Sequence, residues 1–203
     1  MRKEILLTIL ITLFACKRED SNNKLMLQST PNKLIKKISQ SFYDNDLESF
    51  KSTLYGEPKF KKVALKAYDF IQSIYSFKDA LIDRYGSNAW REFGEIKISP
   101  SNYSVEIHER GSSWYDSVVI EEVSDSECII VDYHMGVKYA MIEIKSTWYY
   151  DLEKSFGSKV NCVAIINLLE KQIQILKLGR KLILEGEGLF TIKETMSKAL
   201  FKQ

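Results

Sequence analysis

The chain has 203 residues, of which 45% are hydrophobic and 12% aromatic. This composition excludes a disordered chain, and the length suits one domain of ordinary size behind a short export segment. The net charge is +2, and +1 is left on residues 16–203 because residues 2–4 hold two basic side chains and one acidic one. A surface so evenly balanced gives no general field that gathers nucleic acid, so no nucleic-acid partner is expected.

The first sixteen residues have the pattern of an export signal. Two basic residues precede an apolar run from Ile5 to Ala15 that only two threonines interrupt. Eleven helical residues span about 17 Å, well short of the ~30 Å hydrocarbon core of a bilayer. The run therefore predicts a cleaved signal and not a transmembrane helix. It ends in Leu-Phe-Ala at residues 13–15 followed by Cys16, which resembles the lipobox of bacterial lipoproteins.

That resemblance implies that Cys16 is diacylated and becomes the first residue of the mature chain. Residues 1–15 would then be a lipoprotein signal peptide, and two acyl chains on Cys16 would supply the two signals that stable membrane attachment requires. The polar stretch that follows predicts a flexible tether over residues 16–30. The expected location is the bacterial cell envelope, on the exported side, with the membrane as a partner through this lipid.

Behind the tether the pattern is helical. Apolar residues recur at helical spacing over 32–43 and predict a helix there. Asp46 is placed to cap a second, short helix. We expect Leu47, Phe50 and Leu54 to point inward from this second helix.

A long helix is predicted over residues 60–85. Its apolar positions follow the 3.6-residue period of an amphipathic helix closely. Gly86 is expected to end this helix at its C′ position. Residues 87–93 are predicted to add a short turn of helix that carries Trp90.

Beyond Gly94 the period of the pattern changes from 3.6 to 2, which indicates strands. The connections between these strands are too short for parallel crossovers, so neighbouring strands must be antiparallel. The pattern therefore predicts a meander. The predicted strands are 95–99, 103–109, 113–123, 127–134, 137–145 and 147–152.

Helical periodicity returns over residues 159–185, and Thr191 is predicted to cap a last helix. Helices first, then a sheet, then helices again indicate an α+β fold. We expect one domain over residues 31–203, made of N-terminal helices, a bent antiparallel sheet of five or six strands and C-terminal helices.

This order of elements carries a second resemblance. A helical half followed by strands that end in Trp-Tyr-Tyr-Asp-Leu at residues 148–152 is similar to the nuclear transport factor two-like superfamily. The similarity covers about residues 31–155 at the level of order and pattern. It implies a strongly bent sheet wrapped around a long helix to form a cone that holds a pocket.

Aromatic side chains crowd the predicted sheet. Tyrosine and tryptophan combine a large face with a polar group and suit both concave ligand sites and interfaces. In the cone implied by the second resemblance, an inward acid such as Asp116 would have a raised pKa. The alternative is an ordinary β-rich core. The candidate ligand-binding residues are Trp114, Asp116, Tyr133, Tyr139 and Trp148.

The two histidines, His108 and His134, each follow an acid at a spacing of two, Glu106 and Asp132. Residues i and i+2 share one face of a strand, so each acid could fix its imidazole as a general base. The alternative is two solvated outer faces, and the alternation of apolar and polar residues favours it. No phosphate-binding loop, GxSxG elbow, HExxH pair or EF-hand loop occurs, so no cofactor and no metal site is expected.

Cys128 and Cys162 both lie in apolar settings. Export permits a disulfide between them, whereas two buried thiols are the other interpretation. The absence of a CxxC motif excludes a zinc ribbon or a thioredoxin-type centre.

Together these patterns predict a lipid-anchored lipoprotein that acts as a non-catalytic binding or interaction module. Its expected partner is a small amphipathic ligand in the cone or another envelope protein on the exposed sheet face. One alternative is a nuclear transport factor two-like enzyme that does acid/base chemistry on a small molecule with Asp116, His108 or His134. Another is a purely structural lipoprotein without a ligand cavity.

Overall fold

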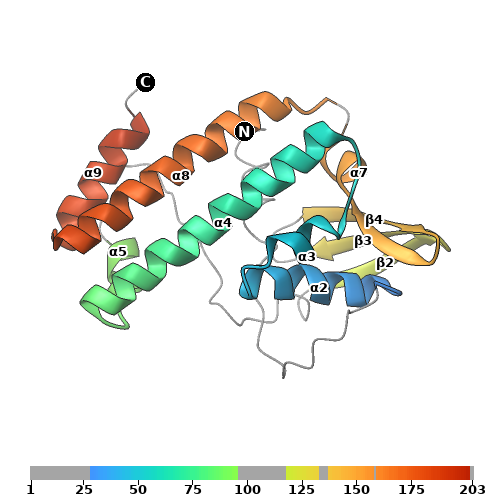
Figure 1. Ribbon diagram of the computed structural model, residues 1–203, viewed down its shortest axis with the longest axis horizontal. Coiled ribbons are helices and arrows are strands. Elements are labelled where there is room, and N and C mark those ends of the chain that lie inside the picture. The colour runs from blue at the N-terminus through green and yellow to red at the C-terminus, as the bar shows by residue number, and fades with distance from the viewer. Residues whose placement is uncertain (1–27, 96–117, 133–136, 158, 202–203) are drawn as a thin grey trace. The chain divides into compact units, whose positions relative to one another are not determined.

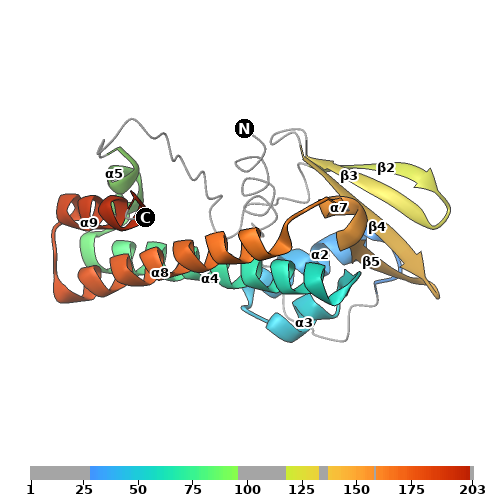
Figure 2. The ribbon, with the colours of Figure 1, turned by 90° about the horizontal axis from the view of Figure 1, so that it is seen from above.

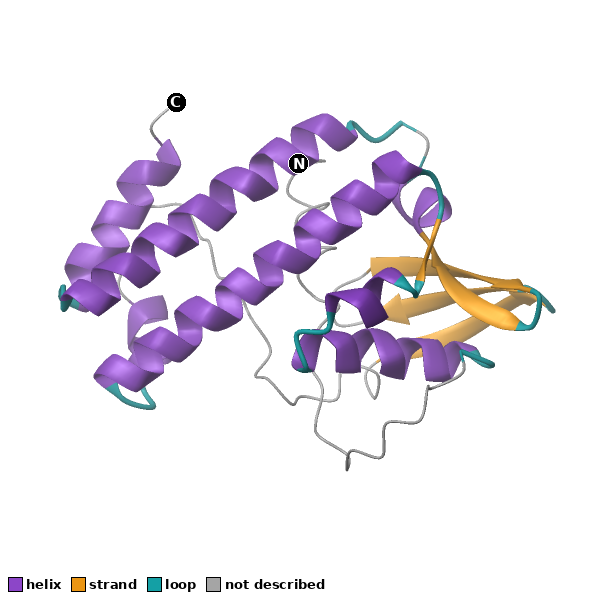
Figure 3. Cartoon of the chain, in the orientation of Figure 1, coloured by secondary structure: helices purple, strands orange, loops and turns teal. Residues whose placement is uncertain are grey.

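The computed structural model describes residues 28–95, 118–132, 137–157 and 159–201. In these residues the chain has an α+β fold with seven helices and one open, five-stranded mixed sheet, so the predicted fold class is confirmed (Figures 1 and 3). The chain divides into two compact units. Unit 1 takes in the described residues of 1–68 and 107–162, and unit 2 those of 69–106 and 163–203. Because the units alternate along the chain, the single domain expected over 31–203 stays a prediction.

Unit 1 opens with α2 (Pro31–Tyr43), which confirms the helix predicted over 32–43. The Thr30 side chain accepts a hydrogen bond from the Lys33 backbone N–H, and Pro31 occupies a first-turn position where a missing N–H costs nothing. The apolar stripe faces inward, since its four members are almost fully buried. They are Leu34, Ile35, Ile38 and Phe42.

The next element, α3 (Leu47–Lys51), begins at the predicted cap Asp46. One part of this prediction was wrong, because Leu54 is not on the inward face of a helix. It lies on β1 (Leu54–Tyr55), a two-residue strand that pairs parallel to β5 (Thr147–Asp151). The Tyr150 N–H donates to the Thr53 carbonyl at 2.8 Å, so pairing with β5 holds this segment extended.

The other strands are β2 (Val118–Ser124), β3 (Glu127–Asp132) and β4 (Val137–Ile144). The sheet order is β1-β5-β4-β3-β2, and the four strands from β2 to β5 form the predicted antiparallel meander. The parallel β1 makes the sheet mixed, which the meander prediction did not include. The predicted strands 95–99 and 103–109 fall outside the described residues, apart from Glu95, which is the last residue of a helix.

A tight turn joins β4 to β5. Both of its central residues have positive φ, 50° at Lys145 and 60° at Ser146. Two left-handed residues in a two-residue loop match the right-handed twist of the flanking strands. The turn sets the register in which Ile144 pairs with Thr147.

A short helix, α7 (Leu152–Phe156), follows β5 directly and was not predicted. The Asp151 carboxylate accepts from the Lys154 N–H at 3.0 Å and so caps its first turn. Leu152 and Phe156 are buried, and the Phe156 ring stacks on Phe60 with their centroids 6.0 Å apart. The helix is therefore held by its cap and by these two apolar contacts.

The long helix α4 (Pro58–Tyr85) confirms the helix predicted over 60–85, and Gly86, with φ of +94°, follows it as expected. Its residues up to Tyr68 belong to unit 1, and those from Asp69 onward belong to unit 2. Unit 2 also holds α5 (Ala89–Glu95), nearly all of α8 (Cys162–Glu185), and α9 (Leu189–Phe201).

The core of unit 2 is built from α4, α5, α8 and α9 (Figure 2). Gly179 lets these helices approach closely, because a Cβ at this position would lie 2.4 Å from the Met196 sulfur and 2.7 Å from the Phe77 ring. The predicted cap at Thr191 was wrong. Helix α9 begins two residues earlier, at Leu189, so Thr191 lies within its first turn. The fully buried core residues are Phe77, Leu81, Ala89, Ile183 and Ile192.

Candidate functional site

One face of the sheet in unit 1 collects the buried side chains. Strand pairing places Met141 opposite both Cys128 and Tyr150, and residues paired in this way project to the same side. This side is the inner sheet face. Its members are between 1% and 7% exposed, so it is a core. They are Cys128, Ile130, Tyr139, Met141, Trp148 and Tyr150.

Two of the five candidate ligand-binding residues lie on this inner sheet face. Tyr139 is 1% exposed and packs edge-on against Tyr150, with ring centroids 6.1 Å apart. Trp148 is 7% exposed. Both rings are thus buried on the inner sheet face, as the β-rich-core alternative expects, and their part in ligand binding stays a prediction.

The other three candidates, Trp114, Asp116 and Tyr133, lie outside the described residues. So do His108 and His134, on which the enzyme alternative depends, and the lipidation candidate Cys16. Among the residues that are described, no group of three or more His, Cys, Asp or Glu side chains is placed to hold a metal ion.

A small polar cluster lies where β5 passes into α7. The Ser155 hydroxyl donates to the Asp151 carbonyl at 2.6 Å and accepts from the Ala140 N–H at 2.9 Å. The second bond gives this β4 N–H a side-chain partner from α7 at the point where β5 has ended. Burial raises the pKa of the Tyr150 phenol well above its ordinary value, and a hydrogen bond with Ser155 opposes this shift. A tyrosine that stays protonated here is no acid/base group near neutral pH. The cluster ends a strand and begins a helix.

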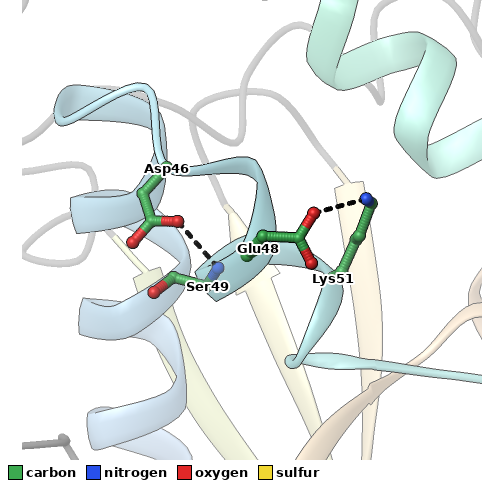
Figure 4. Close-up of polar contacts among 4 residues, drawn as sticks. All are labelled: Asp46, Glu48, Ser49 and Lys51. Atoms are coloured by element: carbon green, nitrogen blue, oxygen red, sulfur yellow. Dashed lines mark hydrogen bonds and ion pairs between the residues drawn. The ribbon is translucent and has the colours of Figure 1, made fainter.

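The α3 cap is the other compact polar group of unit 1 (Figure 4). An Asp46 carboxylate oxygen accepts from the Ser49 N–H at 2.9 Å, and this bond, together with one to the Ser49 side chain, lowers the pKa of Asp46. Glu48 pairs with Lys51 at 2.6 Å along the same helix. Each carboxylate is engaged by a partner within α3 or at its start, so the group serves the helix.

The opposite side of the sheet, the outer sheet face, carries apolar residues that are exposed or half-buried. Tyr55 is 44% exposed, and its ring lies 6.4 Å from the ring of the half-buried Tyr149. Pairing places Ile142 beside Tyr149 on the same side. We call Tyr55, Tyr149 and Ile142 the tyrosine patch.

Charged groups and α7 cover other parts of the outer sheet face. Lys138 and Glu121 lie on the strands either side of β3, and their ion pair at 3.6 Å reaches across that strand. Lys154 of α7 pairs with Glu127 at 2.6 Å. The sequence pattern did not indicate the tyrosine patch, because Tyr55 lies on a two-residue strand that is too short to show a period. The one signal was Tyr149, among the three aromatic residues of the segment 148–152.

The two candidate cysteines are both buried thiols and are not joined to each other by a disulfide. Cys128 belongs to the inner sheet face, and Cys162 is the first residue of α8. Of the two interpretations of the sequence, a disulfide or two buried thiols, the structure shows the buried thiols.

No described helix combines the length and the apolar character that crossing a bilayer requires. Comparison with known proteins adds no relative: no family model, no curated protein and no solved structure matches this chain.

Proposed function

We propose that this protein is a lipid-anchored lipoprotein of the bacterial cell envelope that acts as a non-catalytic interaction module. The observation that carries the anchoring is Cys16, which follows Leu-Phe-Ala at the end of an eleven-residue apolar run. A thioether-linked pair of acyl chains on this cysteine holds the chain at the membrane, and residues 1–15 are removed as the signal.

The tyrosine patch supports the interaction part of the proposal. Tyr55 and Tyr149 present large faces with polar hydroxyls, a combination that is enriched at protein interfaces. Cross-strand aromatic pairs also stabilise a sheet by themselves, by up to about 1 kcal/mol, but such a contact needs no exposure of the ring. The patch suits an apolar or aromatic segment of another envelope protein.

The cone-shaped, nuclear transport factor two-like architecture is part of the same proposal. The order of helices and the antiparallel meander from β2 to β5 agree with it. In that architecture a small amphipathic ligand would occupy a pocket lined by Trp114, Asp116 and Tyr133.

A photocrosslinking experiment in cells tests the anchor and the patch together. A photoreactive phenylalanine analogue replaces Tyr55 in one strain and Lys62, an exposed residue of the same unit, in the control strain. We expect the protein in the membrane fraction in both strains and a discrete crosslinked adduct from position 55 only.

The anchor is tested by a separate variant. Cys16→Ser should abolish processing at residue 16 and the incorporation of lipid. Equal crosslinking at 55 and 62 would contradict the interaction part, and unchanged lipid incorporation in Cys16→Ser would contradict the anchor.

A further inference from the structure

The chain becomes fixed to unit 1 at Gln28, soon after the proposed anchor. The Trp148 N–H donates to the Gln28 carbonyl at 2.7 Å, and the Gln28 side-chain amide donates to the Trp148 carbonyl at 3.0 Å. Gln28 is only 7% exposed. These two bonds attach the chain to the edge of β5, next to the β4–β5 turn.

The length of chain between Cys16 and Gln28 limits how far this edge can lie from the membrane. The two residues are twelve positions apart. Whatever conformation the intervening backbone takes, it spans at most about 40 Å. The end of unit 1 that holds Gln28 therefore stays within about 40 Å of the anchored cysteine.

Lysines gather at this same end. Lys33 and Lys36 are exposed at the start of α2, and a spacing of three places them on one side of the helix. The Lys33 amine bonds to the Ser29 hydroxyl at 3.0 Å, which places it beside the entering chain. The first turn of α2 holds no acid.

The β4–β5 turn adds another exposed lysine, Lys145. Helix α2 packs against β5, and the ribbon views place the first turn of α2 and this turn at the same end of the sheet (Figures 1 and 2). Lys37, on the second turn of α2, bonds to the Gln28 side chain at 3.3 Å. Glu143 is the acid nearest to Lys145 in the sequence, and Asp46 lies close enough to Lys37 to act on its charge.

Positive charge is also concentrated near the proposed anchor in the sequence as a whole. Residues 16–37 hold six basic and two acidic side chains, a net charge of +4. Residues 38–203 hold 21 basic and 24 acidic side chains, a net charge of −3. A bilayer with anionic headgroups attracts the first part and repels the second, and the attraction acts within about 10 Å of the surface.

We infer that Lys33, Lys36 and Lys145 contact anionic phospholipid headgroups and so orient unit 1 with its β5 edge toward the membrane. This inference rests on the proposed anchor at Cys16 and adds the surface that faces the lipid. Each lysine near an anionic surface favours the bound orientation about fivefold, so the three together select one orientation of the tethered unit.

Lysine footprinting on vesicles tests this contact with the full lipidated chain. The protein is reconstituted in phosphatidylcholine vesicles with or without 30% phosphatidylglycerol. A membrane-impermeant amine reagent then labels the lysines, and peptide mass spectrometry reads the rate at each. We expect phosphatidylglycerol to slow the labelling of Lys33, Lys36 and Lys145 at least threefold, and 0.5 M NaCl to restore it. Lys181 and Lys198 of unit 2 should react at the same rate throughout.

A charge variant provides a second readout. When neutral and phosphatidylglycerol vesicles are offered together, we expect the lipidated chain to prefer the phosphatidylglycerol vesicles, and replacing Lys33, Lys36 and Lys145 by Gln should remove this preference. The matched control replaces Lys177, Lys181 and Lys198, three exposed lysines of α8 and α9, and should keep it. Equal rates of labelling of Lys33, Lys36 and Lys145 in both kinds of vesicle would overturn the inference. So would protection that occurs only in native membranes, which would identify an acidic protein as the partner.

Flotation with the two kinds of vesicle separates a failure of the proposed anchor from a failure of the lysine contact. Flotation with neutral vesicles reports the acyl chains alone, so its loss contradicts the proposed function. In that case flotation on anionic vesicles alone still supports the lysine contact, and failure to float on either kind of vesicle overturns it.

Discussion

At the scale of single residues, Asp46 shows how one side chain begins a helix. Its carboxylate accepts the Ser49 N–H, one of the donors that the first turn of α3 leaves without a helical partner (Figure 4). The residue could be predicted as a cap because it precedes an apolar pattern and is of a type that caps helices. Tyr55 and Gln28 could not be predicted in the same way, since their roles depend on contact with β5, nearly a hundred or more residues away.

Asp46→Ala should lower the free energy of unfolding by about 1 kcal/mol, the usual cost of losing a helix cap. Because hydrogen bonds to Ser49 lower the pKa of Asp46 below its ordinary 3.8, its contribution is present above that pH and is lost as the pH falls further. Urea unfolding at pH 7 and pH 3 measures both effects. Glu48→Ala, which removes only an exposed ion pair, should cost less. Equal stability of Asp46→Ala and the parent at pH 7 would show that the cap is not needed.

Tyr150 should make the protein sensitive to alkali. Burial raises the pKa of its phenol above the ordinary 10.0, so its stabilising contribution is complete below pH 10 and is lost as the pH rises beyond it. Tyr150→Phe should therefore lose less stability than the parent between pH 9 and pH 11. Thermal unfolding across this range measures the difference, with Tyr149→Phe on the outer sheet face as the control. The same slope in Tyr150→Phe and the parent would contradict this role.

At the scale of elements, periodicity predicted the long segments well and the short ones poorly. Helices α2, α4 and α8 and the strands from β2 to β5 each carry a period over five or more residues. The five-residue α7 and the two-residue β1 are too short for a period to be visible. They form because Asp151 caps one and because β5 offers an edge to the other.

Gly179 gives a test of packing between elements in unit 2. Alanine is the better helix former by about 1 kcal/mol, yet a Cβ at this position would lie 2.7 Å from the Phe77 ring. Gly179→Ala should therefore lower the free energy of unfolding by about 1–3 kcal/mol, the usual cost of overpacking. Gly94→Ala is the control, since nothing lies within 4 Å of its Cβ position, and should be neutral or stabilising. A stabilised Gly179→Ala would mean that Met196 and Phe77 yield at little cost.

At the scale of the whole molecule, the sequence predicted the α+β class and the order of its parts, because helical and strand periods occupy separate stretches of the chain. The candidate site was harder to predict. Aromatic alternation marks residues that belong to a sheet, but it does not say which side is open. Tyr139 and Trp148 proved to be core residues, whereas the exposed ring of Tyr55 came from a segment that was predicted to be helical.

The roles proposed for the rest of the molecule depend on the anchor, because the tyrosine patch and the lysines at 33, 36 and 145 are both proposed to act at a membrane. The most direct measurement is the mass of the N-terminal peptide of the protein purified from the envelope of expressing bacteria. We expect this peptide to begin at Cys16 and to carry a thioether-linked diacylglycerol. A peptide that reads through from Ala15 to Lys17 with an unmodified Cys16 thiol would contradict the account.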